Sequence, residues 1–186
     1  MWKDILRGIV AGLGATVPMT LAMEAGWRWL PRREQYSLPP RQITEEVTHQ
    51  VGLDDQLNQE EMRWATGAAH LGYGAAMGGL YTFCVRPWLA EGKTRNLAAG
   101  IGWGLTVWTG SYLGLLPGLG ILSPATRHSA RRNALMIGAH IIWGAALEEC
   151  LAWQSAHHKR APKRLTEAAP RTRHVDPVES DASTPS

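Results

Sequence analysis

Four stretches of this chain contain no Asp, Glu, Lys or Arg, and this segregation of charge restricts what the chain can fold into. The uncharged stretches are residues 8–23, 64–85, 96–122 and 133–147. As an α-helix the second stretch is about 33 Å long, enough to cross the roughly 30 Å hydrocarbon core of a bilayer. The sequence therefore predicts four membrane spans, at about residues 5–30, 64–86, 96–117 and 133–153.

Between the first two spans the sequence predicts a short amphipathic helix at about residues 40–51. Pro39 and Pro40 suit the first turn of a helix. Apolar residues then recur every four positions, at Ile43, Val47 and Val51. A helix with such a stripe can lie on the membrane surface or cap the bundle.

The chain beyond Gln154 is rich in Lys, Arg, Pro, Ser and Thr and poor in large apolar residues. Segments of this composition bury too little apolar surface to offset the entropy lost on ordering. We therefore expect a membrane domain of residues 1–155 and a disordered polar tail of residues 156–186. The predicted fold class is all-α, a four-helix transmembrane bundle with a short amphipathic loop helix and a disordered C-terminal tail.

Tryptophans and basic residues also fit a membrane environment. The chain has nine Trp and one Phe, and Trp is enriched where spans meet the headgroups. The tryptophans near predicted span ends are Trp2, Trp27, Trp29, Trp64, Trp88 and Trp153. Basic residues are scattered over the loop ends without forming a patch, which argues against a nucleic-acid partner and favours the lipid bilayer. Their slight excess on one side predicts both termini in the cytoplasm.

Each predicted span carries a row of small or polar residues spaced by four. Small residues at this spacing let helix backbones approach closely in lipid, where no hydrophobic force drives helices together. The glycines that we expect at such helix contacts are Gly12, Gly74, Gly78, Gly110, Gly114 and Gly144.

The few ionisable residues of the spans are predicted to gather in one half of the bilayer. Glu24 lies near the end of the first span, and His70 and His140 lie two or three turns inside the second and fourth. Because alternate spans run in opposite directions, these three positions fall at a similar depth. Glu148 lies nearer the opposite face. Ionisable groups in hydrocarbon are costly and mark candidate functional sites.

Three interpretations of these residues are open. In the first, Glu24, His70 and His140 form a proton-responsive cluster, since histidine changes charge near neutral pH, and Glu148 continues a relay towards the cytoplasm. In the second, the two histidines ligate a b-type haem or, with Glu24, a metal ion, in a small membrane cytochrome or metal-binding subunit. In the third, each histidine only hydrogen-bonds a neighbouring helix, in a packing or scaffold subunit without chemistry.

Three short motifs carry a resemblance to a known family. They are Leu38-Pro39-Pro40-Arg41 in the first loop, His70 followed by Tyr73 and Tyr81, and His140-x-x-Trp143-x-x-x-x-Glu148. These motifs resemble the bacterial YagU-like inner-membrane family, over about three of the four spans and the first loop. That family is largely uncharacterised and is associated with acid resistance. The resemblance implies an inner-membrane protein linked to acid stress, and it singles out His70, His140 and Glu148.

The sequence thus predicts a multi-pass protein of the bacterial cytoplasmic membrane that is not an enzyme. No Ser or Cys lies in a recognisable nucleophile motif, and the chain has no phosphate-binding loop. We expect neither a metal nor a cofactor, with haem b as the alternative. A homo-oligomer or another membrane protein is left open as a partner.

Overall fold

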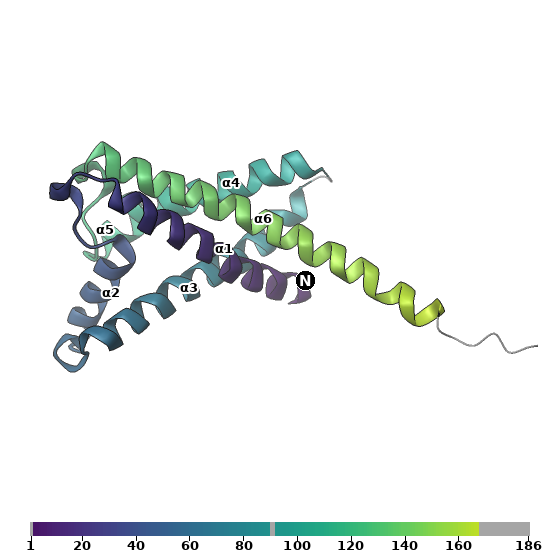
Figure 1. Cartoon of the computed structure of the whole chain (residues 1–186), viewed down its shortest axis with the longest axis horizontal. Coiled ribbons are helices and arrows are strands. Elements are labelled where there is room, and N and C mark those ends of the chain that lie inside the picture. The colour runs from purple at the N-terminus through teal and green to yellow at the C-terminus, as the bar shows by residue number, and fades with distance from the viewer. Residues whose placement is uncertain (1, 90–91, 168–186) are drawn as a thin grey trace, which may run out of the picture. The chain divides into compact units, whose positions relative to one another are not determined.

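The computed structural model describes residues 2–89 and 92–167, and every secondary-structure element in these ranges is a helix (Figure 1). The α-helices are α1 (Trp2–Arg28), α2 (Pro39–Gln50), α3 (Gln59–Cys84), α4 (Lys93–Thr109), α5 (Leu116–Gly118) and α6 (Ala130–Glu167). A π-helix, η4 (Gly110–Leu115), joins α4 to α5. The short 3-10 helices are η1 (Arg32–Glu34), η2 (Asp54–Gln56), η3 (Arg86–Trp88) and η5 (Ala125–Arg127). The all-α class predicted from the sequence is confirmed.

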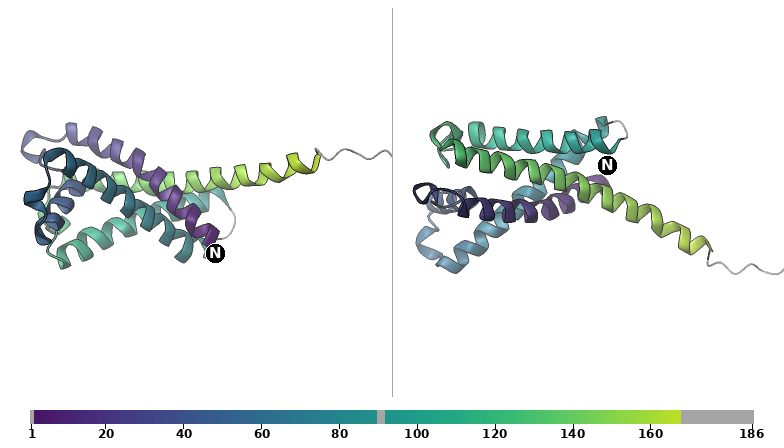
Figure 2. Two further views of the ribbon diagram at one scale, coloured as in Figure 1. Left: turned by 90° about the horizontal axis from the view of Figure 1, so that it is seen from below. Right: turned by 45° about the horizontal axis from the view of Figure 1, so that its top comes forward.

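The described residues divide into two units, the first ending at Gln154 and the second beginning at Ser155. Within the first unit, α1, α3, α4 and α6 alternate in direction, as in an up-down-up-down bundle. The right-hand view of Figure 2 shows α4 and α1 on either side of α6. The helix α1 also packs against α3. The two helices are antiparallel, so the first residues of α1 contact the last residues of α3.

Local sequence signals account for where α2 and α3 begin. Pro39 and Pro40 occupy the first turn of α2, with Leu38 as its N-cap. Asn58 caps α3 in a capping box: its side chain accepts hydrogen bonds from the Glu60 and Glu61 amides, and Glu61 Oε2 accepts from the Asn58 amide at 2.8 Å. Such reciprocal bonds satisfy backbone donors that a helix start otherwise leaves free.

Glycine pairs bring the helix backbones into direct contact. A Cβ atom added to Gly12 would overlap the carbonyl oxygen of Gly74, and one added to Gly78 would overlap that of Gly8. Between α4 and α6, a Cβ on Gly100 would overlap the carbonyl oxygen of Gly144. These α1–α3 and α4–α6 contacts therefore require glycine.

Gly110 and Gly114 do not lie at such a contact, contrary to the sequence prediction. Within the described residues, no atom of another segment lies within 4 Å of a Cβ added at either position. The close approach of α4 to α6 falls instead at Gly100 and Gly104. The π-helix beginning at Gly110 widens the turn, so the residues after it lie on a different face from the row that precedes it.

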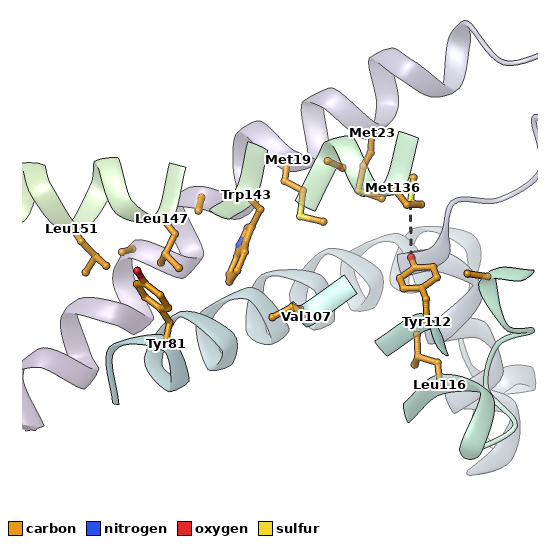
Figure 3. Close-up of a cluster of buried hydrophobic side chains, with 14 residues drawn as sticks. Met19, Met23, Tyr81, Val107, Tyr112, Leu116, Met136, Trp143, Leu147 and Leu151 are labelled. Carbon is orange, nitrogen blue, oxygen red and sulfur yellow. Dashed lines mark hydrogen bonds between the residues drawn. The ribbon is translucent and has the colours of Figure 1, made fainter. Parts of the chain in front are cut away.

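A buried core runs along the first unit between these helices (Figure 3). At one end Tyr81 packs near Leu147 and Leu151, and at the other Tyr112 lies near Met136. Polar atoms in this core are satisfied locally. Thr16 Oγ1 donates to the Gly12 carbonyl at 2.8 Å and accepts from Trp143 Nε1 at 3.3 Å. That second bond ties α1 to α6 near the middle of the core.

The helix α2 turns a polar face inward and leaves part of its apolar stripe outside. Thr44 and Thr48 are buried, whereas Val47 and Val51 are exposed. Both threonine hydroxyls donate to carbonyls within α2, Thr44 to Pro40 at 2.8 Å and Thr48 to Thr44 at 2.9 Å. A hydroxyl bonded in this way can be buried, because its donor is satisfied.

The helix α6 continues to Glu167, so residues 156–167 are helical although the sequence assigns them to a disordered tail. Ala, Lys, Arg, Leu and Glu predominate there and are good helix formers. Extending an existing helix also avoids the unfavourable nucleation step. Residues 168–186, the rest of that predicted tail, lie outside the described residues.

Within the described residues, two helices are long and apolar enough to cross a membrane, where the sequence predicts four spans. They are Trp2–Arg28 and the Ala130–His157 part of α6. The helix α4 has 17 residues before the π-helix begins, fewer than the about 20 that a span requires. Glycines and His70 dilute the apolar character of α3. The described residues thus form four long helices, as the sequence predicts, but only two of these helices qualify as membrane spans.

Candidate functional site

The helices of the first unit part beyond the glycine contacts and leave a cavity of about 280 Å³, which we call the inner cavity. Its walls come from α1, α2, α3, α4, η4, α5 and α6. They include His70, Tyr73, Ser111, Tyr112, His140 and Trp143. Most of the remaining lining is apolar, with three methionines among it: Met19, Met23 and Met77. A mostly apolar cavity with a few convergent polar groups is a typical ligand site.

His140 enters the inner cavity from α6 in a fixed orientation. It is 6% exposed, and its Nδ1 lies 2.8 Å from the carbonyl oxygen of Met136, one turn earlier in α6. A carbonyl can only accept, so Nδ1 carries the hydrogen. In the neutral ring Nε2 then keeps a lone pair. The edge of the ring also packs against Tyr112, with centroids 6.2 Å apart and planes at 87°.

His70 lines the inner cavity and also a second one, of about 870 Å³, which we call the outer cavity. The outer cavity lies where α1 ends and α3 begins, and its charged lining residues are Glu24, Arg28, Arg41 and Arg63. His70, Met23 and Pro40 line both cavities. In the ranges 2–89 and 92–167, the His70 ring forms no hydrogen bond.

The three residues predicted to form one cluster are thus brought together in pairs. His70 and His140 face the inner cavity, and His70 and Glu24 face the outer one. Glu24 does not line the inner cavity. Among the described residues, no group of three or more His, Cys, Asp or Glu side chains could hold a metal ion.

Glu148, on α6, belongs to a separate buried group near the C-terminal end of α3, away from His70 near its start. It is 4% exposed and accepts a hydrogen bond from Tyr81 at 2.5 Å. Arg86 Nη1 lies 3.8 Å from the same carboxylate oxygen. A tyrosine and an arginine on one carboxylate form a charge-compensated group, which differs from the proton relay considered at the sequence level.

The π-helix η4 supplies residues that the sequence did not suggest as part of the site. It carries Ser111, whose hydroxyl lies 2.7 Å from the Tyr73 hydroxyl on α3, and Tyr112, which donates to the sulfur of Met136. A signal for this irregularity exists in the sequence. Pro117 has no N–H to offer the carbonyl of Leu113, and π-helical turns are common where the α-pattern is broken and at functional sites.

Arg132 organises the loop beside the two cavities, and sequence reasoning also missed it. It is 3% exposed and donates hydrogen bonds to three loop carbonyls, those of Glu34 at 2.9 Å, Tyr36 at 3.1 Å and Ser37 at 3.0 Å. Its guanidinium carbon also lies 3.6 Å from the centre of the Tyr36 ring. The adjacent Arg131 is exposed, so the sequence alone does not distinguish the two.

The Leu38-Pro39-Pro40-Arg41 motif lies between this loop and the outer cavity. Leu38, Pro40 and Arg41 all line that cavity. Arg41 Nε donates to Glu45 Oε1 at 2.6 Å, and Arg41 Nη2 donates to Gln59 Oε1 at 2.7 Å. These two bonds fix the guanidinium and connect α2 to the start of α3.

No protein-family model, no curated protein and no solved structure matches this chain.

Proposed function

We propose that the chain is a multi-pass protein of the bacterial cytoplasmic membrane, with both termini in the cytoplasm, that responds to acid through His70 and His140. Exposed apolar residues follow one face of α1 for most of its length. They are Trp2, Leu6, Val10, Leu13, Val17 and Leu21. A continuous apolar stripe of this kind is unfavourable in water and is expected where a helix faces acyl chains.

Exposed tryptophans at both ends of the first unit support the same environment. Trp2, Trp88 and Trp153 lie at one end, Trp29 and Trp64 at the other, and each is between 63% and 89% exposed. Tryptophan side chains are favoured at the two membrane interfaces. By sequence, eleven of the 19 Lys and Arg fall in the N-terminal segment, in residues 86–95 and in the segment after Gln154, and this slight excess supports a cytoplasmic location for the end with the N-terminus.

Cysteine labelling tests membrane insertion and orientation in intact cells. With Cys84 and Cys150 replaced by Ser, we expect a membrane-impermeant maleimide to label Gln56→Cys and to leave Ala156→Cys unlabelled until the cells are opened. Both positions are exposed, so access to them differs only through the membrane. Equal labelling of the two cysteines in intact cells would contradict the proposal.

The observation that carries the acid response is that two histidines from different helices face one cavity. Protonation of both would bring two positive charges into a mostly apolar space, where they repel strongly. The ionisable groups around them are Tyr73 and Tyr112 at the inner cavity and Glu24, Arg28, Arg41 and Arg63 at the outer one. Only Glu24 among these offers a negative charge, and it faces His70 alone. Acid is therefore expected to expand or open the cavity. The resemblance to the YagU-like family supports a link to acid tolerance.

A pH titration of tryptophan fluorescence tests this response. Trp143 lines the inner cavity, so its signal, obtained as the difference between the wild type and Trp143→Phe, should change as the medium is acidified. We expect His70→Gln and His140→Gln each to remove that change and to lower survival of cells in acid. His49→Gln is the matched control, because His49 is exposed on α2 and lines neither cavity. If both cavity variants retain the wild-type titration and survival, the proposal is wrong.

The absorption spectrum of the purified protein separates this function from the cytochrome alternative. The bond from His140 Nδ1 to a carbonyl is also the arrangement that orients metal-ligating histidines. A Soret band that disappears in His140→Ala would replace the acid response with haem binding. A spectrum without that band excludes haem, and the pH titration then distinguishes the acid response from a role of the histidines in packing alone.

A further inference from the structure

The inner cavity presents an apolar surface although five hydroxyl groups line it. The hydroxyls of Tyr73 and Ser111 bond to each other, and Tyr112 donates to the sulfur of Met136. Thr16 and Thr44 donate to the carbonyls of Gly12 and Pro40. Since each hydroxyl already has a partner in the protein, a ligand in this cavity needs no polar groups to match them. Apart from the His70 ring and Nε2 of His140, for which no hydrogen bond exists among the described residues, these walls suit a hydrocarbon chain.

The outer cavity has the opposite character, because positive charge dominates its rim. Arg28, Arg41 and Arg63 face one carboxylate, that of Glu24. In the described part of the chain, neither Arg28 nor Arg63 has an ion-pair partner, while Arg41 is held by Glu45 and Gln59. Two arginines without an ion-pair partner, beside a third that is fixed by Glu45, leave positive charge at this rim, which suits a phosphate group.

The two cavities adjoin each other between the membrane interface and the interior of the bundle. The outer cavity lies at the end marked by Trp29 and Trp64, the level of the lipid headgroups in the proposed membrane. The inner cavity lies deeper, and the two share Met23, Pro40 and His70. The order from positive rim to apolar interior matches the order of groups in a phospholipid.

We infer that the outer and inner cavities together bind an anionic phospholipid, with its phosphate among Arg28, Arg41 and Arg63 and one acyl chain in the inner cavity. This inference rests on the membrane location proposed above, but not on the acid response. The bound chain would pass beside His70, which lines both cavities, and reach Trp143, which lines only the inner one. A lipid held there would also keep water out of the space that the histidines face.

Quenching of Trp143 by brominated lipids tests the inference. The protein is reconstituted in phosphatidylcholine vesicles at neutral pH, with increasing amounts of phosphatidylglycerol brominated on its acyl chains. Brominated phosphatidylcholine with the same chains is the comparison. The Trp143 component is the difference between wild type and Trp143→Phe, which removes quenching of the exposed tryptophans. We expect saturable quenching with at least about a fivefold preference for the anionic lipid, as one or more added basic contacts would give.

Charge variants establish whether the outer cavity is responsible. The double variant Arg28→Gln with Arg63→Gln should abolish the preference for phosphatidylglycerol, whereas Arg33→Gln should retain it, because Arg33 is exposed near the same end and lines neither cavity. Equal quenching by both lipids, quenching that never saturates, or a preference that survives the double variant would each overturn the inference. Measured in vesicles of phosphatidylcholine alone, the pH titration of Trp143 reports separately on the acid response, so a failure of one does not imply a failure of the other.

Discussion

The two ends of the bundle differ in whether the charge of their ionisable groups is compensated by neighbouring residues. At one end the Glu148 carboxylate has Tyr81 at 2.5 Å and Arg86 at 3.8 Å, which compensate its charge. At the other end His70 and His140 line an open space, and in the ranges 2–89 and 92–167 neither forms an ion pair. A compensated group stabilises one arrangement of helices. A histidine pair without compensating charges, which becomes positive on protonation, makes the arrangement of helices sensitive to pH.

The spacing of small residues explains why the two ends differ. Gly8, Gly12, Gly74 and Gly78 hold α1 against α3, and Gly100, Gly104 and Gly144 hold α4 against α6. At the end of these rows, next to Gly74 and to His140 opposite Gly104, the helix faces carry larger residues such as Met19 and Val107, and the inner cavity opens there. Glycine position therefore decides which part of the molecule is closed and which part can accept a ligand.

The largest effect is expected from replacing a glycine of the closed end. Gly12→Leu would force side-chain atoms into the Gly74 backbone, which cannot move without separating α1 from α3. We expect a loss of at least about 3 kcal/mol in the free energy of unfolding, at the upper end for overpacked contacts. An SDS titration of the detergent-purified protein measures it.

Gly72→Leu is the control for this change. Gly72 lies in α3, two residues from Gly74, and a Cβ there meets no atom of another segment within 4 Å. Its replacement should leave the SDS midpoint unchanged or raise it, because leucine favours helix more than glycine does. Equal destabilisation by the two substitutions would mean that the glycine contact does not close this end.

A somewhat smaller loss is expected when the compensated group is broken. Glu148→Leu leaves Arg86 Nη1, already buried without a hydrogen-bond partner, and the Tyr81 hydroxyl without the carboxylate that they face. We expect a decrease of about 3 kcal/mol in unfolding free energy, the low end for a broken buried pair, because Arg86 is partly exposed. The neighbouring Glu149 is exposed, so Glu149→Leu should change stability by less than about 0.5 kcal/mol. Matching losses in both variants would remove the distinction between the two ends.

The closed end was easier to predict from the sequence than the open end, for a physical reason. Small residues spaced by four identify a helix face directly, and Gly12, Gly74, Gly78 and Gly144 lie at observed contacts. Gly110 and Gly114 do not, because the helix changes its hydrogen-bonding pattern at the first of them. A pattern of small residues spaced by four assumes a regular α-helix and so does not predict a π-helical turn, although Pro117 is a sign of one.

The site could be predicted only in part, since its residues meet through tertiary structure. His70 and His140 stand out because ionisable residues are rare in apolar helices, and both face the inner cavity. Ser111 and Arg132 do not stand out, because a serine in a glycine-rich helix and one arginine of a pair have no distinctive pattern. That Glu24 faces only the outer cavity depends on the rotation of α1, which depth along the helix does not specify.

Arg132 offers a test of how the open end keeps its shape. Replacing it with Gln should leave the carbonyls of Glu34, Tyr36 and Ser37 without their donor and lower the unfolding free energy by about 2 kcal/mol, the range for hydrogen bonds to a charged group. Protease cleavage between residues 31 and 38 should become faster. Arg131→Gln, at the exposed neighbouring position, should leave both measurements unchanged. An unchanged cleavage rate in Arg132→Gln would show that the loop is held by other contacts.

The smallest effect, and the one with the opposite sign, is expected from adding a methylene group at the open end. Val107 lines the inner cavity on α4, one turn after Gly104, where a Cβ would overlap the His140 carbonyl. Because the cavity leaves room beside Val107, Val107→Ile should raise the unfolding free energy by up to about 0.8 kcal/mol, the contribution of one buried methylene. Val10→Ile adds the same group to an exposed position of α1 and should change nothing. A loss of stability in Val107→Ile would mean that the open end is as tightly packed as the closed one. A gain accompanied by weaker quenching of Trp143 by brominated phosphatidylglycerol would mean that the added methylene and the acyl chain occupy the same space.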